Sequence, residues 1–367
     1  MHLAEMAVLR AVPAAGVFLA LTRRCPLSCA HCSTESAMDS AEHAERPFRR
    51  LVTSFTGQER PEFIAMSGGE ALLRPRLVRD LADSARLSGT RSYLLSGLYF
   101  ARDGHAVPAA LRAAISAVDH FAVSLDRFHE REVGRRAAFR VLHEIRSWGP
   151  QVSVQITGDG GEDPYVADLV REVRREFADQ VPMLVVPLRS VGRAKTLDVP
   201  AAGPKAAPAP MPAPAPAPVP APCEMAAWPL VTYDGTVLTC CNDDLAAARP
   251  PHLVLGHADH DPWPVLRRRH LDRPLARAVR MFGPRYAKAR FGSGAGASGY
   301  CDVCVTLHRD RGLGERVAGY LDSPAGPAME SAVRGLVERH GPYGFARRHG
   351  IARYSELVTL GWEGRER

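Results

Sequence analysis

Residues 1–195 alternate short apolar runs with longer amphipathic stretches, and this order constrains the fold more than any other feature. The apolar runs are rich in Val, Ile and Leu with little polar alternation, which is typical of strands buried on both faces. Strands that alternate with helices form parallel βα units joined by right-handed crossovers. The runs predicted as strands are "GVFLALT" (16–22), "EFIAMSG" (62–68), "RSYLLSG" (91–97), "HFAVSLD" (120–126), "QVSVQIT" (151–157) and "MLVVPLR" (183–189).

Amphipathic stretches between these runs predict the helices of the same units. Too few units are present for a complete eight-stranded barrel, so the pattern indicates an α/β fold that is a partial barrel or an open sheet. The helices are predicted near residues 41–57, 74–88, 107–117, 130–147 and 163–178.

The unusual residues gather where the predicted strands end. Three cysteines follow the first strand, "SGGE" ends the second, and "SLDRFHE" ends the fourth. Ligands bind outside the carboxyl ends of the strands in barrels and in open α/β sheets. The order of the elements therefore predicts one active site that faces all of these loops.

The composition excludes several classes of protein. The chain has 367 residues, of which 46% are hydrophobic and 24% charged, as in soluble globular proteins. The net charge is +7, but the arginines are scattered, which argues against nucleic-acid binding. No apolar run reaches about 18 residues, so no membrane span is predicted. The segment 11–21 resembles a signal-peptide core but is better interpreted as a buried strand, because Glu5 precedes it and the cysteines follow at once.

Changes of composition predict the domain organisation. Residues 1–199 hold the βα units, and 200–222 alternate Pro and Ala, which predicts an extended spacer. Residues 223–310 carry the other five of the eight cysteines, and 311–367 predict a helical tail to which no function is assigned. We expect a cytoplasmic protein, where cysteines stay reduced and act as metal ligands or catalysts.

Cys25, Cys29 and Cys32 have the spacing C-x3-C-x2-C. Three thiolates can hold three irons of a [4Fe–4S] cluster and leave the fourth iron open to a small molecule. A zinc site with His31 as fourth ligand is the alternative. The spacing favours iron–sulfur over zinc.

This triplet, placed directly after the first strand of a (βα)6 unit, resembles the radical S-adenosylmethionine (SAM) superfamily. The resemblance covers about residues 16–195. It implies a partial (βα)6 TIM-like barrel whose [4Fe–4S] cluster binds SAM and cleaves it to a 5′-deoxyadenosyl radical. Family members usually have an aromatic residue before the third cysteine, and His31 occupies that position here.

Further motifs carry the same resemblance. "SGGE" is similar to the family's GGE motif, which implies that Gly68, Gly69 and Glu70 meet the methionine amino group of SAM. Glu162 is one residue further from Gly158 than the family pattern has its glutamate. Contacts to the remainder of SAM are implied for Ser124, Asp126, Ile156, Gly158, Val191 and Gly192.

A second set of cysteines surrounds a predicted hairpin. Cys223 and Cys240 flank "WPLVTYDGTVLTC" with its Asp-Gly turn, and Cys301 and Cys304 form a C-x2-C pair. Taken alone, four thiolates could make a zinc ribbon. Beside a radical-SAM-like core, the pattern resembles the SPASM/twitch extension. The cysteines of a full SPASM are absent, so the resemblance implies the shorter twitch form, a small α+β extension with one auxiliary [4Fe–4S] cluster.

Two residues remain as candidate catalytic groups. Cys241 is the cysteine left over, and it is either a spare thiol, an alternative cluster ligand or a hydrogen-atom donor to a substrate radical. His129 follows the fourth strand and either touches substrate or lies on the surface at the start of a helix.

The resemblance implies two classes of substrate. Some relatives modify ribosomally made peptides, and others oxidise or epimerise sugars and aminocyclitols. The short stretch 1–15 holds no fused peptide-recognition domain, so a separate recognition protein is an expected partner, with flavodoxin or ferredoxin as electron donor. We favour a peptide substrate. A non-catalytic iron–sulfur or zinc protein is the remaining alternative, and the GGE motif argues against it.

Overall fold

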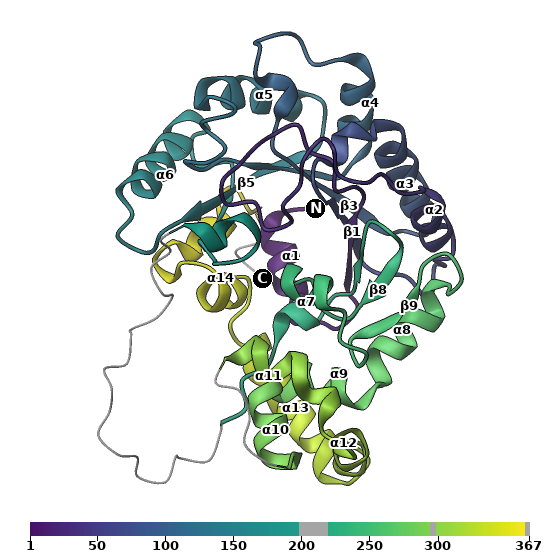
Figure 1. Cartoon of the computed structure of the whole chain (residues 1–367). Coiled ribbons are helices and arrows are strands. Elements are labelled where there is room, and N and C mark those ends of the chain that lie inside the picture. Colours follow the sequence, from purple (N-terminus) through teal and green to yellow (C-terminus); the bar gives the residue numbers. More distant parts are fainter. Residues whose placement is uncertain (198–218, 294–298, 364–367) are drawn as a thin grey trace.

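A mixed sheet forms the centre of the computed structural model, which describes residues 1–197, 219–293 and 299–363 (Figure 1). The strand order is β6-β5-β4-β3-β2-β1-β7-β8-β9. The strands from β1 to β6 are parallel, and each pairs with the next in chain order. They are β1 (Gly16–Ala20), β2 (Phe63–Ser67), β3 (Arg91–Ser96), β4 (His120–Ser124), β5 (Gln151–Gly158) and β6 (Met183–Pro187).

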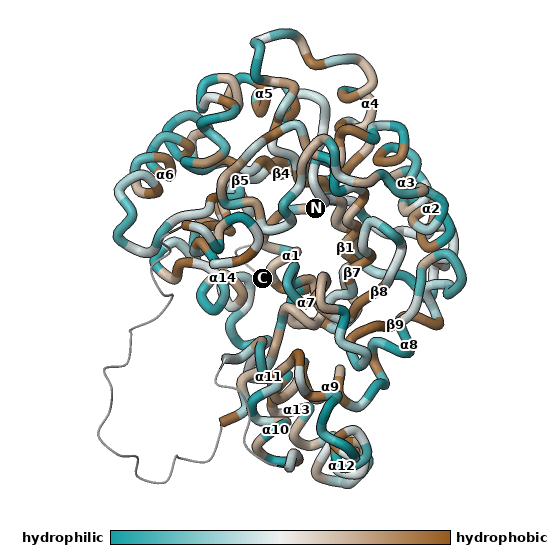
Figure 2. Tube along the Cα trace, viewed as in Figure 1, coloured by the Kyte–Doolittle hydropathy of each residue, from teal (hydrophilic) through white to brown (hydrophobic). Residues whose placement is uncertain are grey.

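Helices cover the outer face of this curved sheet (Figure 1). Val17, Ile64 and Val154 point toward the helices, are fully buried, and belong to one large core cluster. Figure 2 shows the hydrophobic residues concentrated on the strands. The predicted α/β partial barrel is confirmed. Its helices are α2 (Arg46–Thr53), α3 (Pro75–Leu87), α4 (Ala109–Ala117), α5 (Arg135–Ser147) and α6 (Pro164–Glu176).

The concave face of the sheet carries the alternate residues of each strand. Near the carboxyl ends of the strands, Leu95, Ser124 and Gln155 are only partly buried, so solvent reaches this end of the concave face. At the opposite end, Trp228 packs with side chains of β2, β3 and β4. Helix α1 (Leu3–Leu9) adds Met6 to this apolar floor.

The predicted hairpin is present and extends the same sheet. It consists of β7 (Leu230–Val231) and β8 (Thr236–Leu238), with Gly235 in the turn at φ 90°. Strand β7 lies parallel to β1, so the hairpin continues the barrel sheet rather than forming a sheet of its own. Strand β9 (Val254–His257), which the sequence did not predict, pairs with β8.

A helical lobe follows the hairpin and has its own core cluster. Residues of the predicted tail, including Leu313 and Val317, belong to that core. The lobe's helices are α7 (Asp243–Ala248), α9 (Pro274–Phe282), α10 (Pro284–Phe291), α11 (Tyr300–Thr306), α12 (Leu313–Leu321) and α13 (Ala325–Glu338). Helix α8 (Trp263–Asp272) lies between α7 and α9 in the chain, but its Trp263 and Leu266 belong to the core of the barrel.

The last segment of the chain returns to the barrel. Helix α14 (Tyr343–His349) and the 3-10 helix η6 (Ala352–Thr359) pack against α1 and β6. The Ile351 amide donates to the Val185 carbonyl (2.9 Å), so the tail covers the edge of β6.

The domain division made from the sequence stays a prediction. The Pro/Ala spacer (200–222) lies outside the described residues except at 219–222. Within the described ranges, no helix is long and apolar enough to cross a membrane.

Candidate cofactor and active site

The loop after β1 holds the first three cysteines. Cys29 is buried, Cys25 and Cys32 are half-buried, and all three thiols are free. Burial raises the pKa of the Cys25 thiol to about 12, and the neighbouring charges of Glu70 and Cys29 act in the same direction. Thiolates in this position therefore need a compensating cation, which a bound metal centre supplies.

The glycines of "SGGE" allow the end of β2 to pack tightly against this loop. The Gly69 amide donates to the Thr22 carbonyl (2.7 Å), and the Glu70 amide donates to the Arg24 carbonyl (2.9 Å). Gly68 has φ +127°, and a Cβ there would lie 2.5 Å from the Thr22 oxygen. The glycines thus bring two backbones together immediately before Cys25, in addition to any approach to a ligand.

Glu70 is buried at the junction of β2, β3 and the cysteine loop. Its carboxylate accepts hydrogen bonds from the Leu72 amide, the Ser96 hydroxyl and the Gly97 amide, each at 3.0 Å. Burial raises the pKa of Glu70, and these donors oppose the rise. A carboxylate can accept about four hydrogen bonds, so one acceptor position remains for a ligand ammonium group.

Asp126 organises the loop after β4. It is 1% exposed and accepts from the Phe128 amide (2.9 Å), the His129 amide (3.1 Å) and His129 Nδ1 (3.0 Å). His31 Nε2 lies 3.4 Å from the same carboxylate. Burial alone would raise the pKa of Asp126, but the two histidines outweigh it and hold that pKa well below its usual range. These partners occupy most of the acceptor positions of Asp126, and its contact with SAM stays a prediction.

His129 lies inside the site rather than on the surface. Its side chain is 14% exposed and hydrogen-bonds to Cys29 as well as to Asp126. Burial opposes protonation, but the Asp126 carboxylate raises the pKa of His129 to about 10. The ligand atoms of His31, Asp126 and His129 lie within 4.8 Å of one another and could hold a metal ion.

His31 fills the position where the family has an aromatic residue, and it behaves as an aromatic ring here. Its ring stacks on Phe128 with centroids 4.4 Å apart and planes at 16°. The stacking joins the cysteine loop to the loop after β4. The structure therefore gives His31 a packing role, and its zinc ligation with the three cysteines stays a prediction.

The fifth strand contributes mainly backbone to the site. Ile156 is fully buried in the core beneath the helices, and a Cβ on Gly158 would lie 2.3 Å from Val166 Cγ2. Only backbone atoms of these two residues are thus available to a ligand. Ser124 remains partly exposed on the concave face. The adenine and ribose contacts implied for these residues stay predictions.

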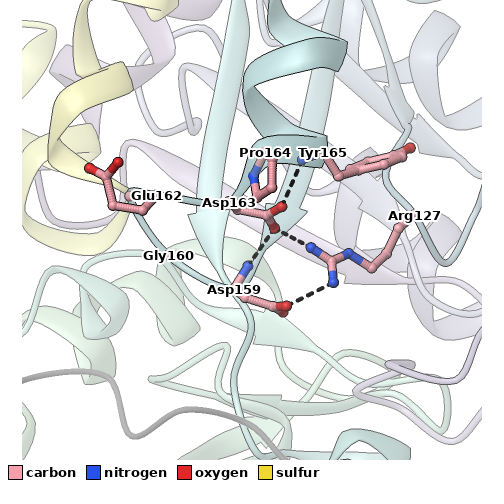
Figure 3. A pocket seen from close by; sticks show the side chains of 8 residues that line it. Arg127, Asp159, Gly160, Glu162, Asp163, Pro164 and Tyr165 are labelled. Atoms are coloured by element: carbon pink, nitrogen blue, oxygen red, sulfur yellow. Dashed lines mark hydrogen bonds and ion pairs between the residues drawn. The ribbon is translucent and has the colours of Figure 1, made fainter.

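An open depression lies at the outer rim of the β4 and β5 loops (Figure 3). It has a volume of about 780 Å³, and the Arg127 guanidinium lies between Asp159 (2.8 Å) and Asp163. Glu162 points away from this pair and is 97% exposed, with Arg353 as its ion-pair partner. This position agrees with the departure of Glu162 from the family spacing.

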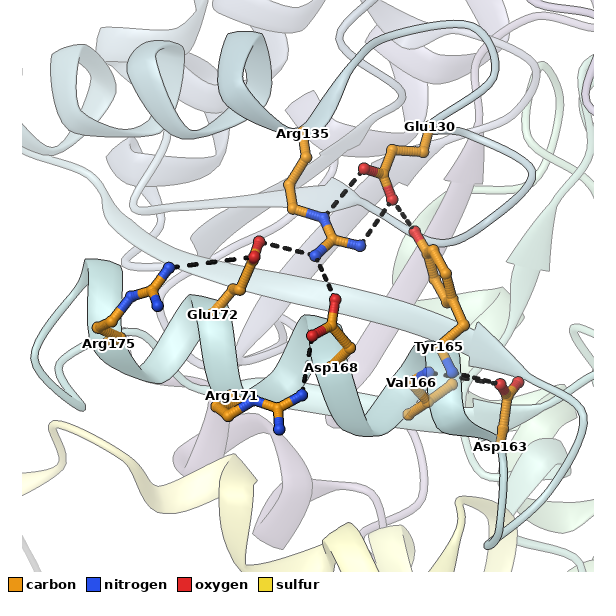
Figure 4. Close-up of polar contacts among 9 residues, drawn as sticks. All are labelled: Glu130, Arg135, Asp163, Tyr165, Val166, Asp168, Arg171, Glu172 and Arg175. Carbon is orange, nitrogen blue, oxygen red and sulfur yellow. Dashed lines mark hydrogen bonds and ion pairs between the residues drawn. The ribbon is translucent and has the colours of Figure 1, made fainter.

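An ion-pair network next to this depression joins the first residue of α5 to side chains of α6 (Figure 4). Arg135 contacts Glu130 and Asp168 at 3.0 Å and Glu172 at 2.7 Å. The Tyr165 hydroxyl also donates to Glu130. Every charge in this network has a partner, so it stabilises the helices without a vacant position for a ligand.

The fold also gathers the second set of cysteines. Burial raises the pKa of Cys223 to about 11, and the charge of Cys301 acts in the same direction. Burial likewise raises the pKa values of Cys240 and Cys304, and each responds to the charge of Cys223. The four sulfurs come from the start of η4 (Glu224–Ala226), the end of β8 and helix α11. Cys240 and Cys304 are buried, Cys223 is half-buried and Cys301 is exposed, and the four thiols are candidate ligands for an iron–sulfur cluster or zinc.

Cys241 lies beside this second site and faces an arginine that the sequence did not single out. Arg10 Nη2 is 3.3 Å from the Cys241 sulfur and 3.4 Å from the Met225 sulfur. Arg10 is 3% exposed, and its guanidinium packs 4.2 Å from the Trp228 ring centroid. Sequence inspection could not find this contact because 231 positions separate the two residues.

Comparison with known proteins gives one sequence relative. No protein-family model matches the chain. The putative peptide biosynthesis protein YydG of Bacillus subtilis (strain 168) is 24% identical over 182 residues, which cover 49% of this chain and 56% of the relative. The match thus spans about half of each protein. This relative supports the radical SAM recognition made from the motifs.

Solved structures of two other proteins are similar at low identity. The protein anSMEcpe with bound AdoMet and Cp18Cys peptide has a TM-score of 0.47 at 10% identity, covering 87% of this chain and 99% of that chain. Streptococcus suis SuiB bound to precursor peptide SuiA has a TM-score of 0.39 at 10% identity, covering 52% of this chain and 43% of that chain.

Proposed function

We propose that this chain is a radical SAM enzyme that modifies a ribosomally made peptide. The observation that carries the proposal is the convergence of the cysteine loop, Glu70 and the Asp126–His129 pair at one edge of the sheet. When bound there, a [4Fe–4S] cluster with SAM supplies a 5′-deoxyadenosyl radical that abstracts a hydrogen atom from substrate.

The chain's own residues bind the cluster and SAM and orient the substrate. Cys25, Cys29 and Cys32 hold three irons, and the free acceptor position of Glu70 receives the methionine amino group. The partly exposed concave face next to these groups, with Leu95 and Gln155, is the space for substrate. The apolar floor under it excludes water from below.

The second cysteine site has a different part in the proposal. Cys223, Cys240, Cys301 and Cys304 would hold an auxiliary [4Fe–4S] cluster with no iron left open, which favours electron transfer over direct substrate binding. Metal analysis separates this cluster from the zinc alternative.

Cys241 is our candidate hydrogen-atom donor. Its partner Arg10 also packs 5.1 Å from the ring of Phe18, a residue of β1 on the concave face. Cys241 thus lies beside Cys240 and is linked through Arg10 to the apolar floor beneath the substrate space. A Cys241→Ala variant should still cleave SAM but fail to return a hydrogen atom to substrate.

The peptide class is preferred because the relative YydG is described as a putative peptide biosynthesis protein. No observation favours sugars or aminocyclitols. A flavodoxin or ferredoxin as electron donor, a separate peptide-recognition protein and a cytoplasmic location complete the proposal, since eight free thiols and two clusters need a reducing compartment.

An anaerobic experiment tests the proposal. The protein is reconstituted with iron and sulfide, and SAM and dithionite are added. We expect about eight irons per chain and formation of 5′-deoxyadenosine. Peptides encoded beside the gene are then added, and their mass and stereochemistry are compared before and after. Bound zinc without SAM cleavage would overturn the enzyme proposal, and a sugar substrate would overturn the peptide part.

A further inference from the structure

Arg193 reaches the cysteine loop from the far end of the βα series. It lies in the 3-10 helix η3 (Gly192–Thr196), which follows β6. Its Nε donates to the Cys29 carbonyl (3.0 Å), and its Nη1 donates to the Ser36 carbonyl (2.9 Å). Its backbone amide donates to the Cys32 carbonyl (3.0 Å). One residue thus satisfies three carbonyls of the loop.

Gly192 permits this close approach. Its φ is +54°, and a Cβ at that position would lie 2.4 Å from the carbonyl oxygens of both Cys32 and Ser33. Ala194, on the other side of Arg193, is fully buried. The turn and the cysteine loop are therefore packed backbone against backbone, and the guanidinium has a fixed place between them.

The loop itself has little regular structure to hold its cysteines. Within it, the Cys32 amide donates to the Cys29 carbonyl (3.2 Å), and the Cys25 amide donates to the Ala37 carbonyl (3.3 Å). Arg193 adds a second donor to the Cys29 carbonyl and also binds the Ser36 carbonyl, so its guanidinium links two parts of the loop that are seven residues apart in the chain. A planar guanidinium can bridge two carbonyls, whereas a lysine ammonium acts as a single flexible point charge.

Two further contacts join the turn after β6 and the cysteine loop to helix α7 near the second cysteine site. Lys195 Nζ pairs with Asp244 (2.8 Å), and the Asp243 side chain hydrogen-bonds to Ser33. Both aspartates lie in the first turn of helix α7, whose N-cap Asn242 follows Cys241.

We propose that Arg193 is a positioning residue that holds Cys29 and Cys32 in their ligating arrangement before any cluster binds. Only the description of these cysteines as cluster ligands rests on the proposed function. The hydrogen bonds of Arg193 belong to the metal-free chain and can be tested there.

The test measures alkylation of cysteines by iodoacetamide in the metal-free full chain, with each site quantified by mass spectrometry. In Arg193→Gln, labelling of Cys29 should become about 10-fold faster or more, because the loop opens locally. In Arg193→Lys the increase should be smaller. The matched control is Arg174→Gln, which removes an exposed arginine paired with Asp179 and should leave the rate unchanged.

Cys240 serves as an internal reference, since it is 4% exposed in the second site and has no hydrogen bond to Arg193. Faster labelling at Cys29 with an unchanged rate at Cys240 supports the proposal. An unchanged rate at Cys29 overturns it. Equal acceleration at both cysteines also overturns it, because the variant would then loosen the whole protein.

A second measurement follows iron loss to a chelator after reconstitution. Removing a partner that orients a ligand typically costs 10- to 100-fold in metal affinity, so iron at the first site should leave at least 10-fold faster in Arg193→Gln. If the parent protein takes up no cluster, the proposed function fails. The labelling result then still decides the role of Arg193.

Discussion

The two cysteine sites are built in opposite ways. The first takes three cysteines from one loop and surrounds them with polar groups, such as Glu70 and His129. The second collects four cysteines from distant segments, and Cys240 and Cys304 lie in the apolar core of the helical lobe. Three thiols beside a carboxylate with a free acceptor position suit a centre that binds a ligand. Four thiols, two of them buried in an apolar core, suit a centre in which protein ligands fill every position.

The largest expected effect separates the two sites directly. Cys25→Ala should abolish formation of 5′-deoxyadenosine and lower the iron content from about eight to about four per chain. Cys304→Ala should lower the iron content equally but keep SAM cleavage, because the second site has no open iron. Iron analysis and chromatography of 5′-deoxyadenosine measure both. If both variants lose cleavage, the functional division between the sites is wrong.

Glu70 tests whether the first site recognises a cation. Glu70→Gln keeps the shape of the side chain and removes its charge, and a hydrogen bond to a charged group contributes about 1.5–3 kcal/mol. The dissociation constant of SAM, measured by equilibrium binding to the reconstituted protein, should rise about 10- to 100-fold. Glu62→Gln is the control, since Glu62 is half-exposed and pairs with Arg60. Equal affinities in both variants would contradict the role of Glu70.

Gly192 tests the packing on which the first site depends. Gly192→Ala places a methyl group against two carbonyl oxygens and requires a left-handed backbone, which together should cost about 2–4 kcal/mol of unfolding free energy. Iron at the first site should be lost preferentially. Gly134→Ala, with nothing within 4 Å of the added Cβ, is the control and should change stability little. Denaturant unfolding gives the free energy of unfolding of both variants. Similar values for the two would show that the close contact at position 192 does not require a glycine.

Acid should weaken the sheet that carries the first site. His120 is fully buried, and burial lowers its pKa to about 3, while its ring nitrogens contact the Met1 carbonyl (2.9 Å) and Ser153 Oγ (2.7 Å). The charged neighbours are the N-terminal ammonium group, His2 and Glu5. The unfolded chain binds a proton near pH 6.5 that the folded chain refuses until about pH 3, so stability falls as the pH falls through this window.

At pH 5 the loss attributable to His120 should be about 2 kcal/mol relative to pH 7.5. Denaturant unfolding of the metal-free protein at the two pH values measures it, and His120→Gln should have a flatter pH dependence. A parent and variant with the same slope would show that His120 does not carry the effect.

The smallest effect is expected far from both sites. Arg135→Gln breaks the network between α5 and α6, and because solvent screens its partners the cost should be about 1 kcal/mol or less. Iron content and SAM binding should not change. A change in iron content or SAM binding would mean that the network also determines the structure of the first site.

The sequence by itself determined the local features. Alternating apolar and amphipathic runs specified β1 to β6 within a few residues of their bounds, because buried strands and amphipathic helices have different periods. The Asp-Gly turn at Gly235 specified the hairpin through its positive φ. The spacing of Cys25, Cys29 and Cys32 was readable because all three lie in one loop.

Only the tertiary structure decided which distant residues meet. It placed β7 beside β1, covered the edge of β6 with the tail at Ile351, and brought Arg10 to Cys241 and Arg193 to Cys29. These contacts join segments that share no periodic pattern and no common motif. Arginine reaches far and is common on surfaces, so its partner depends on how the strands and loops stack in space and cannot be read from its neighbours in the chain.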